Sequence, residues 1–206
     1  ARVKFDLAYF NRITKGGLPP KTLNVALAGT GVGKSLFMCH LASSFIQQGK
    51  NVLYITLEMA EERIAERIDA NLLDVTIDEL YEMPKQYYES KIEKLQKKVS
   101  GQLIIKEYPT AAAHSGHFKN LMDELALKKT FKPDVVFIDY LNICASSRFK
   151  GGNISSYFYI KAIAEELRGM AVEYNVPIMS ATQTTRAGYM SSDVGLEDTS
   201  ESFGLP

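Results

Sequence analysis

Residues 28–35 constrain the fold of this chain more than any other stretch of its sequence. An apolar run at 23–28 precedes them, and a pattern with helical spacing follows them over 34–48. A glycine-rich turn between a strand and a helix is typical of a phosphate-binding loop, because glycines let backbone N–H groups turn inward and the helix N-terminus adds its positive dipole. The stretch reads Ala28-Gly29-Thr30-Gly31-Val32-Gly33-Lys34-Ser35.

The residue types in this loop predict a division of roles. We expect all eight residues to contact the phosphates of a nucleotide, with Lys34 reaching the β- and γ-phosphates and Ser35 holding Mg²⁺. The strict pattern has glycine at position 28, where this chain has alanine. The alternative interpretation is a glycine-rich turn of purely structural value, but the Gly-Lys-Ser ending favours the phosphate loop.

Apolar runs and helical patterns alternate along the rest of the chain. Short apolar strands separated by helices are typical of a parallel sheet that is covered on both faces. The sequence therefore predicts one domain with an α/β fold, in which helices flank a mostly parallel central sheet. The expected strands are 23–28, 51–57, 102–106, 135–139 and 177–181, and the expected helices are 34–48, 61–73, 87–99, 117–129 and 154–174.

Several polar residues lie at the ends of these expected strands. Because ligands of parallel sheets collect at the C-terminal edge, such residues are candidates for chemistry. Asp139 is predicted to bind Mg²⁺ through water or to hydrogen-bond Ser35. Glu58 is a candidate to activate the attacking water, Gln183 to sense the γ-phosphate, and Arg186 to contact phosphate. Spacing alone leaves open that Glu58, Gln183 and Arg186 are ordinary polar residues after strands.

Composition excludes several classes of protein. Lys plus Arg and Asp plus Glu both number 24, so the formal net charge of zero argues against a domain that binds nucleic acid by bulk charge. Two cysteines are too few for a disulfide framework and fit a reducing compartment inside the cell. His114 and His117 lack a third nearby ligand, which argues against a metal site. The apolar runs fall short of the roughly 20 residues that cross a bilayer, which argues against a transmembrane helix.

Taken together, these motifs resemble the ATPase domain of hexameric replicative DNA helicases of the DnaB type, and most of all its T-even phage members. The resemblance covers about residues 5–206. It is carried by the phosphate loop and by the stretches 15–20, Leu57-Glu58-Met59, Ile138-Asp139-Tyr140-Leu141, and Asn175-Val176-Pro177 followed by Gln183.

The resemblance implies a RecA-like P-loop NTPase that uses ATP and Mg²⁺ to move a homo-hexameric ring along single-stranded DNA. Lys34, Glu58 and Gln183 would then be catalytic. Primase and a helicase loader would be partners, the location would be the cytoplasm, and no membrane would be involved. The resemblance also implies that residues 1–206 are one ATPase domain without the primase-contacting domain and the arginine finger, so that the isolated chain would hydrolyse ATP poorly.

The resemblance places a DNA-contacting loop at residues 146–153, with Arg148 and Lys150 as candidate contacts. A surface loop is the simpler interpretation without it. A ring of six subunits would gather these cations in one channel, so a neutral chain could still bind DNA. The second DNA-facing loop of the family corresponds to residues 200–204, where the expected arginine is absent.

Two other functions stay open at this point. A recombinase or a clock-type ATPase would use the same fold to build a filament or a ring that does not translocate. A nucleotide-gated binding module would bind ATP without turnover.

Overall fold

The computed structural model describes residues 1–149 and 154–184, which form helices and strands in alternation. None of the helices in this part of the chain combines the length and the apolar character needed to cross a membrane. The elements, in chain order, are α1 (Ala8–Ile13), β1 (Leu23–Ala28), α2 (Lys34–Gln47), β2 (Val52–Thr56), α3 (Glu61–Leu73), α4 (Ile77–Glu82), α5 (Lys85–Lys98), β3 (Leu103–Glu107), α6 (Ser115–Lys129), β4 (Val135–Asp139), the 3₁₀ helix η1 (Leu141–Ile143), α7 (Ser156–Tyr174) and β5 (Ile178–Gln183).

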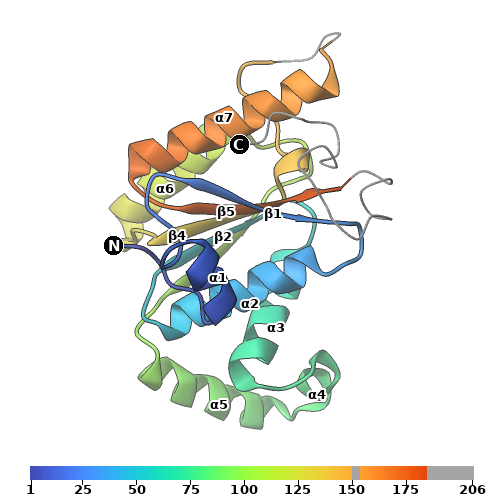
Figure 1. Ribbon diagram of the computed structural model, residues 1–206. Coiled ribbons are helices and arrows are strands. Elements are labelled where there is room, and N and C mark those ends of the chain that lie inside the picture. The colour runs from blue at the N-terminus through green and yellow to red at the C-terminus, as the bar shows by residue number, and fades with distance from the viewer. Residues whose placement is uncertain (150–153, 185–206) are drawn as a thin grey trace.

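The strands form one five-stranded sheet in the order β1-β5-β4-β2-β3, and every pair is parallel (Figure 1). Ala28 pairs with Gln183 across β1 and β5, and Thr56 pairs with Asp139 across β2 and β4. Because the strands run in one direction, their C-terminal ends meet at one edge of the sheet. The predicted α/β fold and all of its expected strands are confirmed.

Helices cover both faces of the sheet and create two apolar cores (Figure 1). The helices α6 and α7 pack on one face, where Phe118 and Leu167 join Ile55 and Ile138 of the sheet. The helices α2 and α3 pack on the other face against Tyr54 and other buried strand residues. This two-layer covering explains why the central strands β2 and β4 are apolar along most of their length and buried at every position.

Two short helices were not among the expected elements. α1 has no side-chain cap, and α4 begins at a capping box in which Thr76 accepts from the backbone N–H of Glu79. α5 follows Pro84 and starts two residues earlier than expected. In the view of Figure 1, α4 and α5 lie below α2 and α3, and none of the residues of α5 is fully buried.

Candidate active site

A cleft of about 300 Å³ opens at the C-terminal edge of the sheet. It brings together residues from β5, α2, α3 and the loops between the strands and helices, which are distant in sequence. Asp139, at the end of β4, lies under this group with 1% of its surface exposed. The lining residues are Thr30, Gly31, Gly33, Lys34, Ser35, Leu36, Glu58, Met59, Arg67, Tyr140 and Gln183.

The phosphate loop has the backbone that its glycines predict. Gly31 and Gly33 have φ angles of 74° and 100°, a region that residues with a Cβ rarely adopt. An added Cβ would meet no described atom within 4 Å at Gly31, so conformation rather than space requires glycine there. Ala28 is the last residue of β1 and its carbonyl accepts from the N–H of Thr184 at 3.2 Å. Alanine is compatible with this extended backbone, which explains why the departure at position 28 leaves the loop intact.

Lys34, the first residue of α2, reaches back across the loop. Its Nζ donates to the carbonyl oxygen of Gly29 at 3.0 Å and lies 5.9 Å from the centre of the Tyr140 ring. Burial lowers the pKa of Lys34, whereas Glu58 and Asp139 nearby raise it. A cation held against a phosphate loop is suited to bind phosphate oxygens.

One carboxylate oxygen of Asp139 accepts a hydrogen bond, and the other has no partner among the described residues. Tyr54 donates to Oδ2 at 2.8 Å, whereas the buried Oδ1 has no hydrogen-bond partner among the described residues. Burial raises the pKa of Asp139, while the hydroxyl groups of Tyr54 and Ser35, with Arg67 and Lys34, lower it. A buried carboxylate oxygen without a partner is unfavourable, and the Ser35 hydroxyl group is near enough to Asp139 to lower its pKa. Asp139 and Ser35 therefore fit a Mg²⁺ site, because Mg²⁺ in nucleotide sites keeps several waters and takes few protein ligands.

Glu58 lies in the bend after β2, with its side chain exposed at the cleft. Three hydrogen bonds shape this bend. The Thr56 hydroxyl donates to the Met59 carbonyl at 2.7 Å and accepts from the Met59 N–H at 3.2 Å. The Leu57 N–H donates to the Asp139 carbonyl at 3.0 Å. The bend is thus held against β4, and Glu58 is placed within the same cleft as Lys34.

Gln183 ends β5 and connects the cleft to the segment after β4. Its Nε2 donates to the hydroxyl group of Tyr140 at 3.3 Å. The preceding residue, Thr182, donates through Oγ1 to Oδ1 of Asn142 at 2.7 Å. The end of β5 is therefore tied at two points to residues 140–142, which follow the candidate magnesium aspartate.

Two polar residues of the cleft, Arg67 and Tyr140, had no role assigned from the sequence. Arg67 comes from α3 and is close enough to Asp139 to lower its pKa. Tyr140 follows Asp139 directly, so its position next to the candidate metal residue could have predicted that it lies in the cleft. No comparable signal marks Arg67, because only the packing of α3 brings it to the cleft. Arg186 lies outside the described residues.

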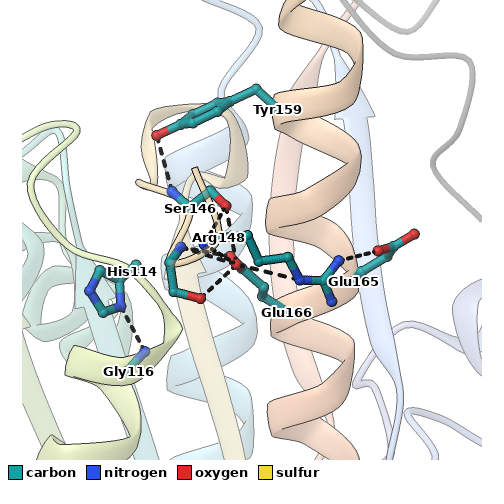
Figure 2. A network of polar contacts seen from close by, with 8 residues as sticks. His114, Gly116, Ser146, Arg148, Tyr159, Glu165 and Glu166 are labelled. Carbon is teal, nitrogen blue, oxygen red and sulfur yellow. Dashed lines mark hydrogen bonds and ion pairs between the residues drawn. The ribbon is translucent and has the colours of Figure 1, made fainter. Parts of the chain in front are cut away.

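Figure 2 shows how Arg148, a candidate DNA contact, is held at the surface of α7. Its Nη1 pairs with Oε2 of Glu165 at 2.6 Å, and its Nε lies 3.9 Å from Oε1 of Glu166. The Arg148 side chain is about half exposed. Lys150, the second candidate, lies outside the described residues, as does the stretch 200–204.

Glu166 organises the backbone that carries Arg148 (Figure 2). This buried carboxylate accepts from the hydroxyl groups of Ser146 and Ser147 and from the N–H groups of Ser147 and Arg148, at 2.7 to 3.1 Å. Tyr159 adds a hydrogen bond from the Ser146 N–H at 3.0 Å. Glu166 is a charged residue on the apolar face of α7, one turn after Ile163. This position in the sequence could have predicted a buried polar network.

The two histidines form a helix cap. Gly116 donates through its N–H to Nδ1 of His114 at 3.0 Å, and the His114 N–H donates to Nδ1 of His117 at 3.1 Å. Over residues 1–149 and 154–184, no three His, Cys, Asp or Glu side chains are grouped as a metal site. The pair therefore caps the N-terminus of α6.

The parallel sheet and the phosphate loop that enters α2 define the class of this protein, a P-loop nucleotide-binding domain. Residues 3–194 match the profile of the DnaB-like helicase C terminal domain. The chain belongs to this family.

The relatives and solved structures agree with this assignment. The chain is 48% identical over 208 aligned residues to the DnaB-like replicative helicase of Enterobacteria phage T4, covering 100% of this chain and 44% of that protein. The chain thus spans less than half the length of this relative.

Two solved structures have the same fold. One is a DnaB-like replicative helicase described with its interactions with primase, with a TM-score of 0.79 at 19% identity over 100% of this chain and 50% of that one. The other is described as an ATPase domain, with a TM-score of 0.76 at 18% identity over 99% of this chain and 73% of that one. The expected RecA-like fold is confirmed.

Proposed function

We propose that this chain, residues 1–206, is the ATP-driven motor domain of a hexameric replicative DNA helicase. The observation that carries the proposal is one cleft that gathers Lys34, Ser35, Glu58 and Gln183 above the buried Asp139. Family membership supports helicase over recombinase or clock-type ATPase, because the profile of the helicase domain spans nearly the whole chain.

The residues of the cleft divide the work of phosphoryl transfer. Lys34 and the loop amides bind the β- and γ-phosphates and oppose their negative charge. Ser35, and Asp139 through water, hold Mg²⁺, which supplies further positive charge at the phosphates when bound. Glu58 accepts a proton from the attacking water and orients it. Arg67 lines the same cleft, where its charge is available to the phosphates.

Gln183 and Tyr140 are suited to report the state of the γ-phosphate. The hydrogen bond between them joins the cleft to the segment that continues through η1 to Arg148. A change at Gln183 when the phosphate leaves would therefore be passed to the DNA-contacting segment. Arg148 and Lys150 are the proposed contacts to the DNA backbone.

The remaining parts of the proposal come from the family. Six copies of the chain would form a ring around single-stranded DNA, and the residue that completes each active site would come from a neighbouring subunit. Primase and a helicase loader are proposed partners, and the cytoplasm of the infected cell is the proposed location for a phage protein. The isolated 206-residue chain is expected to bind nucleotide and to hydrolyse it poorly.

The test is ATP hydrolysis by the helicase that carries this domain, with and without single-stranded DNA. We expect DNA to stimulate turnover in the wild type, and Glu58→Gln to lose at least about 100-fold in turnover while still binding ATP. Glu62→Gln, an exposed change in the first turn of α3, is the control and should behave as wild type. Filaments in electron micrographs would instead support a recombinase, and binding without turnover would support a nucleotide-gated module.

A further inference from the structure

Tyr54 places a buried hydroxyl group against the candidate magnesium aspartate. It lies in the middle of β2 with 0% of its surface exposed, and its Oη donates to Oδ2 of Asp139 at 2.8 Å. The thiol of Cys39 on α2 completes the arrangement, with Sγ 3.8 Å from the same Oη. The Tyr54 hydroxyl group thus donates to the carboxylate and accepts from the thiol.

The sheet fixes where this hydroxyl group lies. Tyr54 pairs with Phe137 across β2 and β4, and their rings stack at 5.5 Å with 12° between the planes. Phe137 and Asp139 are alternate residues of one strand, so their side chains share a face of the sheet. The Tyr54 ring therefore lies on that face and extends along it to the carboxylate at the strand end.

This contact distinguishes the two oxygens of Asp139. Oδ2 accepts from Tyr54, and the buried Oδ1 is left without a partner among the described residues. A carboxylate that could rotate would offer either oxygen to a ligand. The hydrogen bond removes that freedom and keeps the open oxygen on the side away from Tyr54.

We infer that Tyr54 is a positioning residue that holds the Asp139 carboxylate in the orientation needed for Mg²⁺ binding. The inference rests on the proposed function, because it takes Asp139 as the magnesium residue. Packing alone does not account for the hydroxyl group, since phenylalanine would fill the same space and stack on Phe137 equally well. Buried polar groups are unfavourable unless they are hydrogen-bonded, and here the acceptor is Asp139. Partners of this kind change metal affinity by about 10- to 100-fold when they are removed.

The experiment measures Mg²⁺ affinity in the full chain carrying Tyr54→Phe. A fluorescent ATP analogue is bound to the protein, and Mg²⁺ is titrated in. We expect the half-saturating Mg²⁺ concentration to rise about tenfold, while the affinity for the analogue in excess chelator stays within about twofold of wild type. Unchanged Mg²⁺ dependence in a folded Tyr54→Phe chain would overturn the inference.

Matched variants separate positioning from packing. Tyr88→Phe removes another hydroxyl group that donates to a carboxylate, Oδ2 of Asp69 at 2.6 Å, and should leave Mg²⁺ binding unchanged. Cys39→Ala alters the same core but keeps the bond from Tyr54 to Asp139, so its Mg²⁺ affinity should also match wild type. A shift in Cys39→Ala as large as that in Tyr54→Phe would assign the effect to packing and overturn the inference.

A double-mutant cycle tests whether Tyr54 acts through Asp139. Asp139→Asn alone should weaken Mg²⁺ binding measurably, and adding Tyr54→Phe should then weaken it no further. An additional loss in the double variant would contradict action through Asp139. Wild-type protein that binds the analogue without any Mg²⁺ dependence would instead contradict the proposed function, so the two failures are distinguishable.

Discussion

The side-chain amide of Gln183 donates to the hydroxyl group of Tyr140 at 3.3 Å. This bond joins the last residue of β5 to the residue that follows Asp139. From Tyr140 the chain runs through η1 to residues 146–148, which Glu166 holds against α7. The nucleotide cleft and the candidate DNA contact are therefore connected by one short, hydrogen-bonded segment.

Tyr140→Phe tests this connection. The change removes the acceptor of the Gln183 amide but keeps the ring beside Lys34. Because one hydrogen bond contributes about 1 kcal/mol, we expect DNA stimulation of ATP hydrolysis to fall about fivefold while ATP affinity stays within about twofold. Steady-state hydrolysis with and without DNA measures both, and Tyr87→Phe on α5 is the control. Full stimulation in Tyr140→Phe would exclude this route.

Glu165→Gln tests whether Arg148 is available to DNA. Glu165 pairs with the Arg148 guanidinium group and would repel a phosphate in the same place. Removing its charge should tighten binding of a single-stranded oligonucleotide by about two- to fivefold at low salt, with a smaller gain at high salt. Fluorescence anisotropy at several salt concentrations measures this. Weaker binding in Glu165→Gln would show that the ion pair supports the DNA-contacting conformation.

Glu166→Ala tests whether the segment before residue 149 depends on a buried acceptor. The change leaves the N–H groups of Ser147 and Arg148 and two hydroxyl groups without their partner. We expect the free energy of unfolding to drop by about 2–3 kcal/mol, because several hydrogen bonds to a charged acceptor are lost and the hydroxyl group of the buried Ser146 loses its carboxylate partner. Glu165→Ala, which breaks an exposed pair, should lower it by less than about 1 kcal/mol. Urea denaturation measures both, and equal losses would contradict the organising role of Glu166.

Asp69 on α3 predicts a dependence of stability on pH. Burial raises the pKa of this carboxyl group, and the hydrogen bond from Tyr88 only partly opposes the shift. The folded chain therefore binds this proton more tightly than the unfolded chain, so the contribution of Asp69 to stability decreases as pH rises from its unfolded pKa through its raised folded pKa. Asp69→Asn should stabilise the chain more at pH 7 than at pH 4. Urea denaturation of wild type and Asp69→Asn at the two pH values measures this. A larger gain in the free energy of unfolding at pH 4 than at pH 7 would contradict a raised pKa for Asp69.

Much of the fold could be predicted from the sequence, because the apolar strands of a covered parallel sheet leave a clear pattern. The run 135–139 matches β4 at both ends, and the strand predicted at 51–57 is observed at Val52–Thr56. The helix α1 was missed because it has six residues and no side-chain cap. The helix α4 was equally short, but its Thr76 and Glu79 capping box was a readable signal.

The site could be predicted only where a residue follows a strand or lies in the phosphate loop. Lys34, Ser35, Glu58 and Gln183 met in one cleft because parallel strands end at a common edge. Arg67 could not be found this way, because α3 reaches the cleft through tertiary packing. The contact of Tyr54 with Asp139 was equally hidden, since a tyrosine within an apolar strand is usually a core residue.

The central claim is that the phosphate loop of this chain binds Mg-nucleotide, and the affinity of the Lys34→Ala variant for a fluorescent ATP analogue tests it most directly. Lys34 is the cation that the loop holds through the Gly29 carbonyl oxygen, and charge-assisted contacts to phosphate are strong. We predict that Lys34→Ala weakens binding about 10- to 100-fold, whereas Lys94→Ala on the exposed face of α5 binds as wild type. Equal affinity of Lys34→Ala and wild type would contradict the account.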